Sequence, residues 1–241
     1  MTLRARLLTP ITVVVAAAAL LGCSSTPEPT TGPSIPPGIT APPPTAPATP
    51  EAEIPSELPA EIAGVDTTDW QQIGVPSGSA TFRIPADWTV REVDGGLDLL
   101  RADGQRQLVY REAPDTGDGR CVNADGVPVA WRTAILDSSQ DVELAGAPNV
   151  AFGAAALQLG EQWIVSVGLR PAGAAQSPSC PIINAFDSAA GTIGFGSEVI
   201  VNGAGEASPW QVASLDDGRS YTGDDEYLNI RAILMSLELL A

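Results

Sequence analysis

Short runs of apolar residues separated by turn residues make up most of the chain after residue 64. Between Ala80 and Ala113 three clusters of proline, aspartate and glycine interrupt these runs. This spacing is typical of antiparallel strands joined by tight turns, and it predicts a meander. The residues expected on its inward face, with Trp88 interpreted as a core side chain, are Phe82, Ile84, Trp88, Val90 and Val93.

The middle of the folded region gives a mixed pattern. Residues 129–136 are compatible with a strand, whereas the alanine-rich run at 148–160 predicts a helix, although Gly153 lies within it. Three further strands are expected at 161–170, 191–203 and 208–216. The glycines of the second of these do not have the spacing of a nucleotide-binding loop, and glycine bulges in a strand explain them better.

The C-terminal segment has the pattern of an amphipathic helix. Residues 222–239 begin with a Thr-x-x-Asp capping pattern, and acidic residues follow at the positive end of the expected helix. Its apolar residues at helical spacing are Tyr227, Ile230, Leu234 and Leu237. The pattern as a whole predicts one α+β domain over 65–241, an antiparallel sheet with the C-terminal helix packed on it and one further helix.

The N-terminal segment has the pattern of an export signal. Arg4 and Arg6 precede an apolar run from Leu7 to Leu21, which is too short to span a bilayer comfortably. The run ends in Leu-Leu-Gly-Cys at residues 20–23, which resembles the bacterial lipoprotein box. The resemblance implies that residues 1–22 are removed and that the Cys23 sulfur carries diacylglycerol, whose acyl chains anchor the protein. The alternative is an ordinary secretory signal.

A proline-rich segment follows the expected lipidation site. Residues 24–59 contain 12 of the 22 prolines and almost no large apolar residue, so they cannot build a core. We therefore expect residues 23–64 to form a lipidated, disordered tether. Its threonines are possible sugar acceptors, although the chain has no Asn-x-Ser/Thr sequon.

Two stretches resemble the motifs that bracket Mog1/PsbP-like α/β domains. They are FRIPADWTV at 82–90 and IRAILMSLEL at 230–239. Actinobacterial lipoproteins of unknown function show similar arrangements, with a pair of cysteines between the brackets. The resemblance implies an α+β fold and a binding or assembly factor rather than an enzyme, although a shared fold is weak support for a function.

The charged composition excludes several function classes. The net charge is −17 at pH 7, so nucleic acid is not an expected partner. The chain has no histidine and no lysine, which removes Ser-His-Asp triads, Ser-Lys dyads and imidazole metal sites. Paired carboxylates remain as possible catalysts. The clustered acids, interpreted mainly as turn and helix-start residues without EF-hand spacing, are Asp216, Asp217, Asp224, Asp225 and Glu226.

The cysteine count predicts one disulfide bond. If Cys23 carries lipid, Cys121 and Cys180 remain as a pair in an oxidising compartment. A zinc site needs more ligands than two cysteines, and a cysteine nucleophile would lack its usual histidine base. We expect the two residues to be bonded, with their Cα atoms about 4.4 to 6.8 Å apart. No metal, no cofactor and no catalytic residue are expected.

These observations predict a membrane-anchored lipoprotein on the extracytoplasmic face of the cell membrane. The first hypothesis is a non-catalytic binding or assembly module of the cell envelope, which contacts the membrane through the lipid on Cys23. Trp131, Trp163 and Trp210 are candidate contact residues for an envelope protein, with core packing as the favoured alternative. The second hypothesis is a carrier of a lipid or another apolar envelope molecule, which predicts a cavity between the terminal helix and the sheet. The third is a carboxylate-dependent glycan hydrolase.

Overall fold

The computed structural model describes residues 60–117, 120, 121, 123, 125–129, 131–159, 161–202 and 210–240. These residues belong to a compact unit that spans Ile54–Ala241, and a separate unit spans Met1–Glu53. The expected signal peptide, the lipidation site Cys23 and the tether up to residue 59 lie outside the described residues. The described part of the unit begins a few residues before the expected domain boundary at residue 65.

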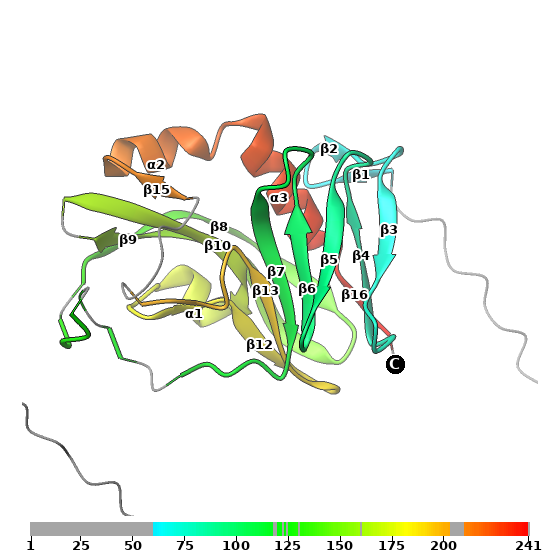
Figure 1. Ribbon diagram of the computed structural model, residues 1–241, viewed down its shortest axis with the longest axis horizontal. Helices are drawn as coiled ribbons and strands as arrows, with labels where there is room; N and C mark the ends of the chain where they lie inside the picture. The colour runs from blue at the N-terminus through cyan, green and yellow to red at the C-terminus, as the bar shows by residue number, and fades with distance from the viewer. Residues whose placement is uncertain are drawn as a thin grey trace, which may run out of the picture. The chain divides into compact units, whose positions relative to one another are not determined.

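The described elements follow one another as strands with three interspersed helices (Figure 1). Their bounds are β1 (Glu61–Ile62), β2 (Val65–Asp66), β3 (Gln71–Gly74), β4 (Ala80–Ile84), β5 (Thr89–Val93), β6 (Gly96–Leu100), β7 (Arg106–Glu112), β8 (Thr133–Leu144), β9 (Ala147–Leu159), β10 (Gln162–Pro171), α1 (Ala172–Gln176), β11 (Ile182–Ile183), β12 (Ala185–Ser188), β13 (Gly191–Gly196), β14 (Ile200–Val201), β15 (Gln211–Val212), α2 (Leu215–Tyr221), α3 (Asp225–Met235) and β16 (Glu238–Leu239).

All strand pairs among the described residues are antiparallel. The main sheet has the order β5-β6-β7-β13-β10-β9-β8, with β12 paired to β13 and β15 paired to β10. A second sheet has the order β16-β4-β3, and two pairs, β1-β2 and β11-β14, stand alone. The domain is therefore mostly antiparallel β, with fewer helical residues than the α+β prediction implied.

The meander predicted over Ala80–Ala113 is confirmed for β5, β6 and β7, which are neighbours in the main sheet. The exception is β4, which pairs with β3 and β16 in the second sheet. Its connection to β5 contains a turn in which the Trp88 N–H donates to the Pro85 carbonyl at 3.0 Å. This turn places Trp88 in the core, as predicted, and the chain then enters the main sheet at β5.

The helix predicted at 148–160 is wrong, because these residues form most of strand β9. β9 pairs with β10 in continuous register from Leu159 to Val150, and β8 pairs along its other edge. Ala154, Ala155 and Ala156 are all buried, which shows that neighbouring structure covers both faces of the strand. Small side chains are needed where a strand is enclosed on both faces, and this packing overrides the helix propensity of alanine.

The predicted C-terminal helix is confirmed in its core but not at its ends. α3 begins after Asp224, and Thr222 instead ends α2, with its hydroxyl donating to the Arg219 carbonyl at 2.8 Å. Beyond Ser236 the chain becomes extended and pairs with β4 as β16. The four residues predicted to face the core, Tyr227, Ile230, Leu234 and Leu237, are all buried.

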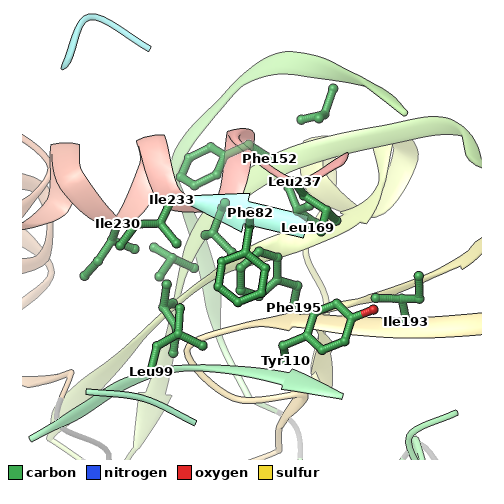
Figure 2. Close-up of a cluster of buried hydrophobic side chains, with 14 of the residues drawn as sticks. Phe82, Leu99, Tyr110, Phe152, Leu169, Ile193, Phe195, Ile230, Ile233 and Leu237 are labelled. Carbon is green, nitrogen blue, oxygen red and sulfur yellow. The ribbon is translucent and has the colours of Figure 1, made fainter. Parts of the chain in front are cut away.

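The main core lies where α3 meets strands from both sheets. Figure 2 shows Phe82 of β4 and Phe195 of β13 close together, with Ile230 and Ile233 of α3 nearby. The two phenylalanine ring centroids are 5.1 Å apart. Phe152 of β9 packs edge-on against Tyr227 of α3, with 6.2 Å between ring centroids. Side chains from the terminal helix therefore fill the centre of the contact between that helix and the sheet. A pocket of about 370 Å³ lies at the C-terminal end of the helix, beside Phe82, Met235 and Leu237.

A buried carboxylate joins the strands of the meander. Asp98 on β6 is 3% exposed and accepts hydrogen bonds from Arg91 on β5 and Arg111 on β7. Burial alone raises the pKa of Asp98, but the hydrogen bonds from Arg111 and Arg91 outweigh burial, and the pKa lies below its ordinary value. The stabilisation that this carboxylate provides is therefore present above about pH 4 and is lost as the pH falls through the lowered pKa.

Replacing Asp98 by asparagine is expected to lower the free energy of unfolding at pH 7 by about 1 to 2 kcal/mol, because Arg111 loses its charged partner. The difference from the wild type should shrink as the pH falls from 7 to 3, because below about pH 4 the unfolded wild-type chain binds a proton that the folded carboxylate, with its lowered pKa, binds less readily. Urea denaturation at both pH values measures this change. Asp216→Asn is the matched control, since the Asp216 side chain is 88% exposed and pairs only at the surface. Equal losses at pH 7 and pH 3 would contradict the electrostatic explanation.

Candidate functional site

The central strand β10 is covered on both faces. Val165, Val167 and Leu169 belong to the main core, whereas Ser166, Gly168 and Arg170 alternate with them and therefore face the other side. On the main-core side α2 covers the strand, since Gly218 packs against Val165. α1 lies on the opposite side of the sheet, below β9 and β10 in the view of Figure 1. That second side holds the candidate site.

Arg170 is an enclosed cation at the end of β10. Its side chain is among the largest fully buried ones, and 1% of the residue is exposed. Nη2 donates to the Gly153 carbonyl at 2.8 Å, whereas Nε is enclosed without a hydrogen-bond partner among the described residues. No carboxylate of the described part of the chain forms an ion pair with this guanidinium.

Burial lowers the pKa of Arg170 to about 10. The side chain therefore remains protonated at neutral pH, and this buried positive charge forms no ion pair with a carboxylate of the described residues. A buried charge without a partner destabilises a folded protein by several kcal/mol in most settings. Functional sites are where proteins most often keep a buried charge that destabilises the fold. Arg170 is therefore a candidate binding residue.

Gly153 on β9 provides the space for the Arg170 side chain. A Cβ atom at this position would lie 3.2 Å from Arg170 Nε and 3.1 Å from the Ala175 Cβ of α1. Both distances are tighter than ordinary van der Waals contact, so a larger residue would have to move the guanidinium or the helix. Packing against Arg170 and α1 therefore explains why a glycine interrupts the alanine-rich strand, and the sequence alone does not show this contact.

A second polar group is enclosed on the same side of β10. Asn184 Nδ2 donates to Ser166 Oγ at 2.9 Å and to the Glu198 carbonyl at 2.6 Å, and its Oδ1 has no partner among the described residues. The side chain lies directly over Gly168, where a Cβ would come within 2.4 Å of Asn184 Cγ. This contact fixes the segment that connects β11 to β12, and that segment forms part of the cleft described next.

A cleft of about 430 Å³ opens beside Arg170. Of the described residues that line it, Arg170 is the one basic residue and Asp187 is the one acidic residue. The Asp187 carboxylate accepts a hydrogen bond from the Thr192 hydroxyl at 2.8 Å. The remaining lining residues are mainly apolar or small, and they are Thr116, Pro171, Ala174, Pro178, Ser179, Pro181, Ile182, Ile183, Ala185 and Phe186.

The disulfide bond holds one wall of this cleft. Cys121 and Cys180 are bonded, and their Cα atoms are 5.8 Å apart, within the expected range. Cys180 directly precedes Pro181, which lines the cleft, and the Thr133 hydroxyl donates to the Pro178 carbonyl at 2.8 Å. The bridge therefore joins the loop before β8 to the segment between α1 and β11. Cys121 precedes and Cys180 follows the segment 148–160, which was expected to be a helix and forms most of strand β9.

The clustered acids of the sequence lie apart from this cleft and act at helix starts. Asp216 and Asp217 occupy the first turn of α2 rather than a turn, and the Asp217 N–H donates to Ser214 Oγ at 3.1 Å. Glu226 in the first turn of α3 accepts hydrogen bonds from Arg101 and from the Tyr221 hydroxyl. Within the described residues, no group of three or more acidic or cysteine side chains is arranged to hold a metal ion.

The three tryptophans considered as surface contacts differ in their positions. Trp210 is buried in the main core and packs edge-on against Tyr221, with 5.2 Å between ring centroids. Trp131 is half-buried and packs on a smaller apolar cluster around Leu157 and Ile182, on the side of the sheet that carries the cleft. Trp163 is also half-buried. Core packing, the favoured alternative, therefore holds for Trp210.

Sequence reasoning missed Arg170. Residues 161–170 were expected to form a strand, and Arg170 at its end was not among the candidate site residues. The only available signal was the alternation of Ser166, Gly168 and Arg170 against apolar residues. That alternation indicates a common face, but it does not indicate that α1 and the β11-β12 segment cover the face.

No protein-family model matches the chain, and a comparison with curated proteins finds no matching sequence. Of the helices formed by residues 60–240 where they are described, none has the length and apolar character required to cross a membrane.

Proposed function

We propose that the chain is a membrane-anchored, extracytoplasmic lipoprotein whose folded domain is a non-catalytic binding module of the cell envelope. The lipoprotein-box resemblance at residues 20–23 supports the anchor and the location. The absence of histidine and lysine from the sequence supports a non-catalytic role. The resemblance of residues 82–90 and 230–239 to Mog1/PsbP-like domains favours a binding or assembly factor and remains a prediction.

The observation that carries the binding role is the enclosed guanidinium of Arg170 in the wall of a cleft. Small-molecule sites are usually concave, largely apolar and equipped with a few polar groups that orient the ligand, and the 430 Å³ cleft fits this description. A ligand that brings negative charge to Arg170 would offset the cost of burying the cation. The cleft is therefore the proposed binding site of the module.

A carrier of an apolar envelope molecule is the second candidate function, and the apolar wall formed by Pro178, Ile182 and Phe186 favours it. Its proposed site is this cleft, because the apolar wall lies in the same cleft as the enclosed Arg170. The glycan hydrolase has less support. Two of the clustered acids that it requires, Asp216 and Glu226, are paired with Arg219 and Arg101.

Mass spectrometry of the full chain purified from the envelope of its own cells tests this proposal. Under denaturing conditions the mature chain should begin at Cys23 and carry the mass of a diacylglyceryl group. Under native conditions the wild type and Arg219→Met should retain a small co-purifying molecule, whereas Arg170→Met should have lost it. Arg219 is a suitable control because its side chain is 59% exposed and lies on α2, away from the cleft. A chain without acyl mass would overturn the anchor, and equal spectra for both variants would overturn the assignment of the site.

A further inference from the structure

We propose that the cleft beside Arg170 binds a small organic carboxylate, a monoanion with an apolar body. The inference rests on the proposed function, because it names the ligand class of the site assigned above. Three properties of the cleft carry it, namely its charge balance, the donors that remain on the guanidinium, and the composition of its walls.

The charge balance favours a ligand with one negative charge. Among the described residues that line the cleft, Arg170 is the only basic one, and Asp187 contributes a carboxylate. The chain as a whole carries a net charge of −17, so its field opposes anions. One guanidinium offsets one negative charge, and a second charge on the ligand would face Asp187 without compensation. A monoanion is therefore favoured over a phosphate monoester, which carries nearly two charges at neutral pH.

The hydrogen bonding of the guanidinium leaves donors for a carboxylate. Only Nη2 donates within the protein, to the Gly153 carbonyl, and Nη1 has no hydrogen-bond partner among the described residues. The hydrogen bond from Nη2 to the Gly153 carbonyl and the close approach of Nε to Gly153 orient the guanidinium before a ligand arrives. A planar, oriented guanidinium matches the planar carboxylate group, and pre-organised donors bind with a smaller entropic cost.

The walls of the cleft indicate the remainder of the ligand. Pro178, Pro181, Ile182 and Phe186 provide apolar surface beside the charge. The hydroxyls of Thr116 and Ser179 are the neutral polar side chains of the lining besides Thr192, which already donates to Asp187. A volume of about 430 Å³ is typical of sites for small molecules. The cleft therefore fits an apolar group attached to a single carboxylate.

Calorimetric titration with three probes of equal chain length tests the ligand class. Hexanoate, hexan-1-ol and hexyl phosphate are titrated into the lipid-anchored chain in nanodiscs, with empty nanodiscs as the blank for partitioning. Hexanoate should bind at least about tenfold more tightly than hexan-1-ol, which is the discrimination expected for one charge-assisted hydrogen-bonded contact. Hexyl phosphate should bind more weakly than hexanoate because of Asp187.

Substitutions of charged residues test how much the charges of the cleft contribute to hexanoate affinity. Arg170→Met should weaken hexanoate binding about tenfold or more, and Arg219→Met should leave the affinity unchanged. Asp187→Asn should strengthen hexanoate binding severalfold and reduce the discrimination against hexyl phosphate, because it removes the opposing charge while retaining an acceptor for Thr192.

The outcomes distinguish this inference from the proposed function. Equal affinity for hexan-1-ol and hexanoate, or tighter binding of hexyl phosphate, would overturn the carboxylate class and leave a binding cleft in place. A co-purifying neutral molecule in the native mass spectrum would have the same consequence. Absence of binding by every probe, together with a native spectrum without any co-purifying mass, would overturn both.

Discussion

Replacing Cys121 and Cys180 together by serine is expected to lower the free energy of unfolding by about 2 to 5 kcal/mol. The bridge closes a loop with a sequence separation of 59 residues. A loop of this length restricts the unfolded chain enough to stabilise the fold by roughly 4 kcal/mol in the chain-entropy description. Urea denaturation of the wild type and the double variant measures the difference.

Two further measurements control this experiment. A reductant should destabilise the wild type toward the level of the double variant and leave the double variant unchanged. Hexanoate binding should also weaken in the double variant, because Cys180 adjoins Pro181 in the cleft wall. Two reactive thiols at positions 121 and 180 in the native, unreduced protein would contradict the bridge.

Replacing Arg170 by methionine is expected to raise the free energy of unfolding by about 1 to 3 kcal/mol, which is opposite to the usual effect of a buried substitution. The unbranched methionine side chain can occupy the space of the aliphatic part of Arg170. The substitution removes an enclosed charge that has no carboxylate partner among the described residues. The hydrogen bond to the Gly153 carbonyl is lost, and its contribution of about 1 kcal/mol is smaller than the cost of the buried charge.

The control variants make the Arg170 result specific. Arg219→Met should change the stability by less than about 0.5 kcal/mol, because its ion pair with Asp216 is exposed. Gly153→Ala should destabilise the wild type more than it destabilises the Arg170→Met background, since the added methyl group meets Nε at 3.2 Å. A lower stability of Arg170→Met would show that the guanidinium supports the fold, and it would remove the main reason to consider the cleft functional. Higher stability combined with lost ligand binding is the signature expected of a binding residue.

The parts of the fold that local patterns determine were predictable from the sequence. Tyr227, Ile230 and Leu234 recur at helical spacing, and they are the buried face of α3. The turns of the meander place glycine and aspartate between β5, β6 and β7, which pair as neighbours. In both cases the residues that determine the structure are close together in the sequence, so periodicity and turn chemistry suffice.

The remainder depends on contacts between distant segments. The alanines of β9 favour a helix in isolation, and only β8, β10 and the covering helix α1 make an extended strand with small side chains preferable. Arg170 is comparable, because its burial results from a helix and a disulfide-linked segment that follow it in the chain. Thr222 is a further case at short range. Its hydroxyl donates to the Arg219 carbonyl of α2, and Asp224, not Thr222, is the N-cap residue of α3.

The pairing of β16 with β4 also has a consequence for the order in which the domain forms. Glu238 lies opposite Thr81, and the Arg83 N–H donates to Ser236 Oγ at 2.8 Å across a separation of 153 residues. During synthesis the N-terminal part of the chain appears first, and β16 is the last strand to appear. One edge of β4 therefore has no partner until almost the whole chain has been made. Pairings between distant segments form slowly, and an open strand edge can recruit another chain. We therefore expect β4 to gain its second neighbour, β16, late in folding, and its open edge to be covered only then.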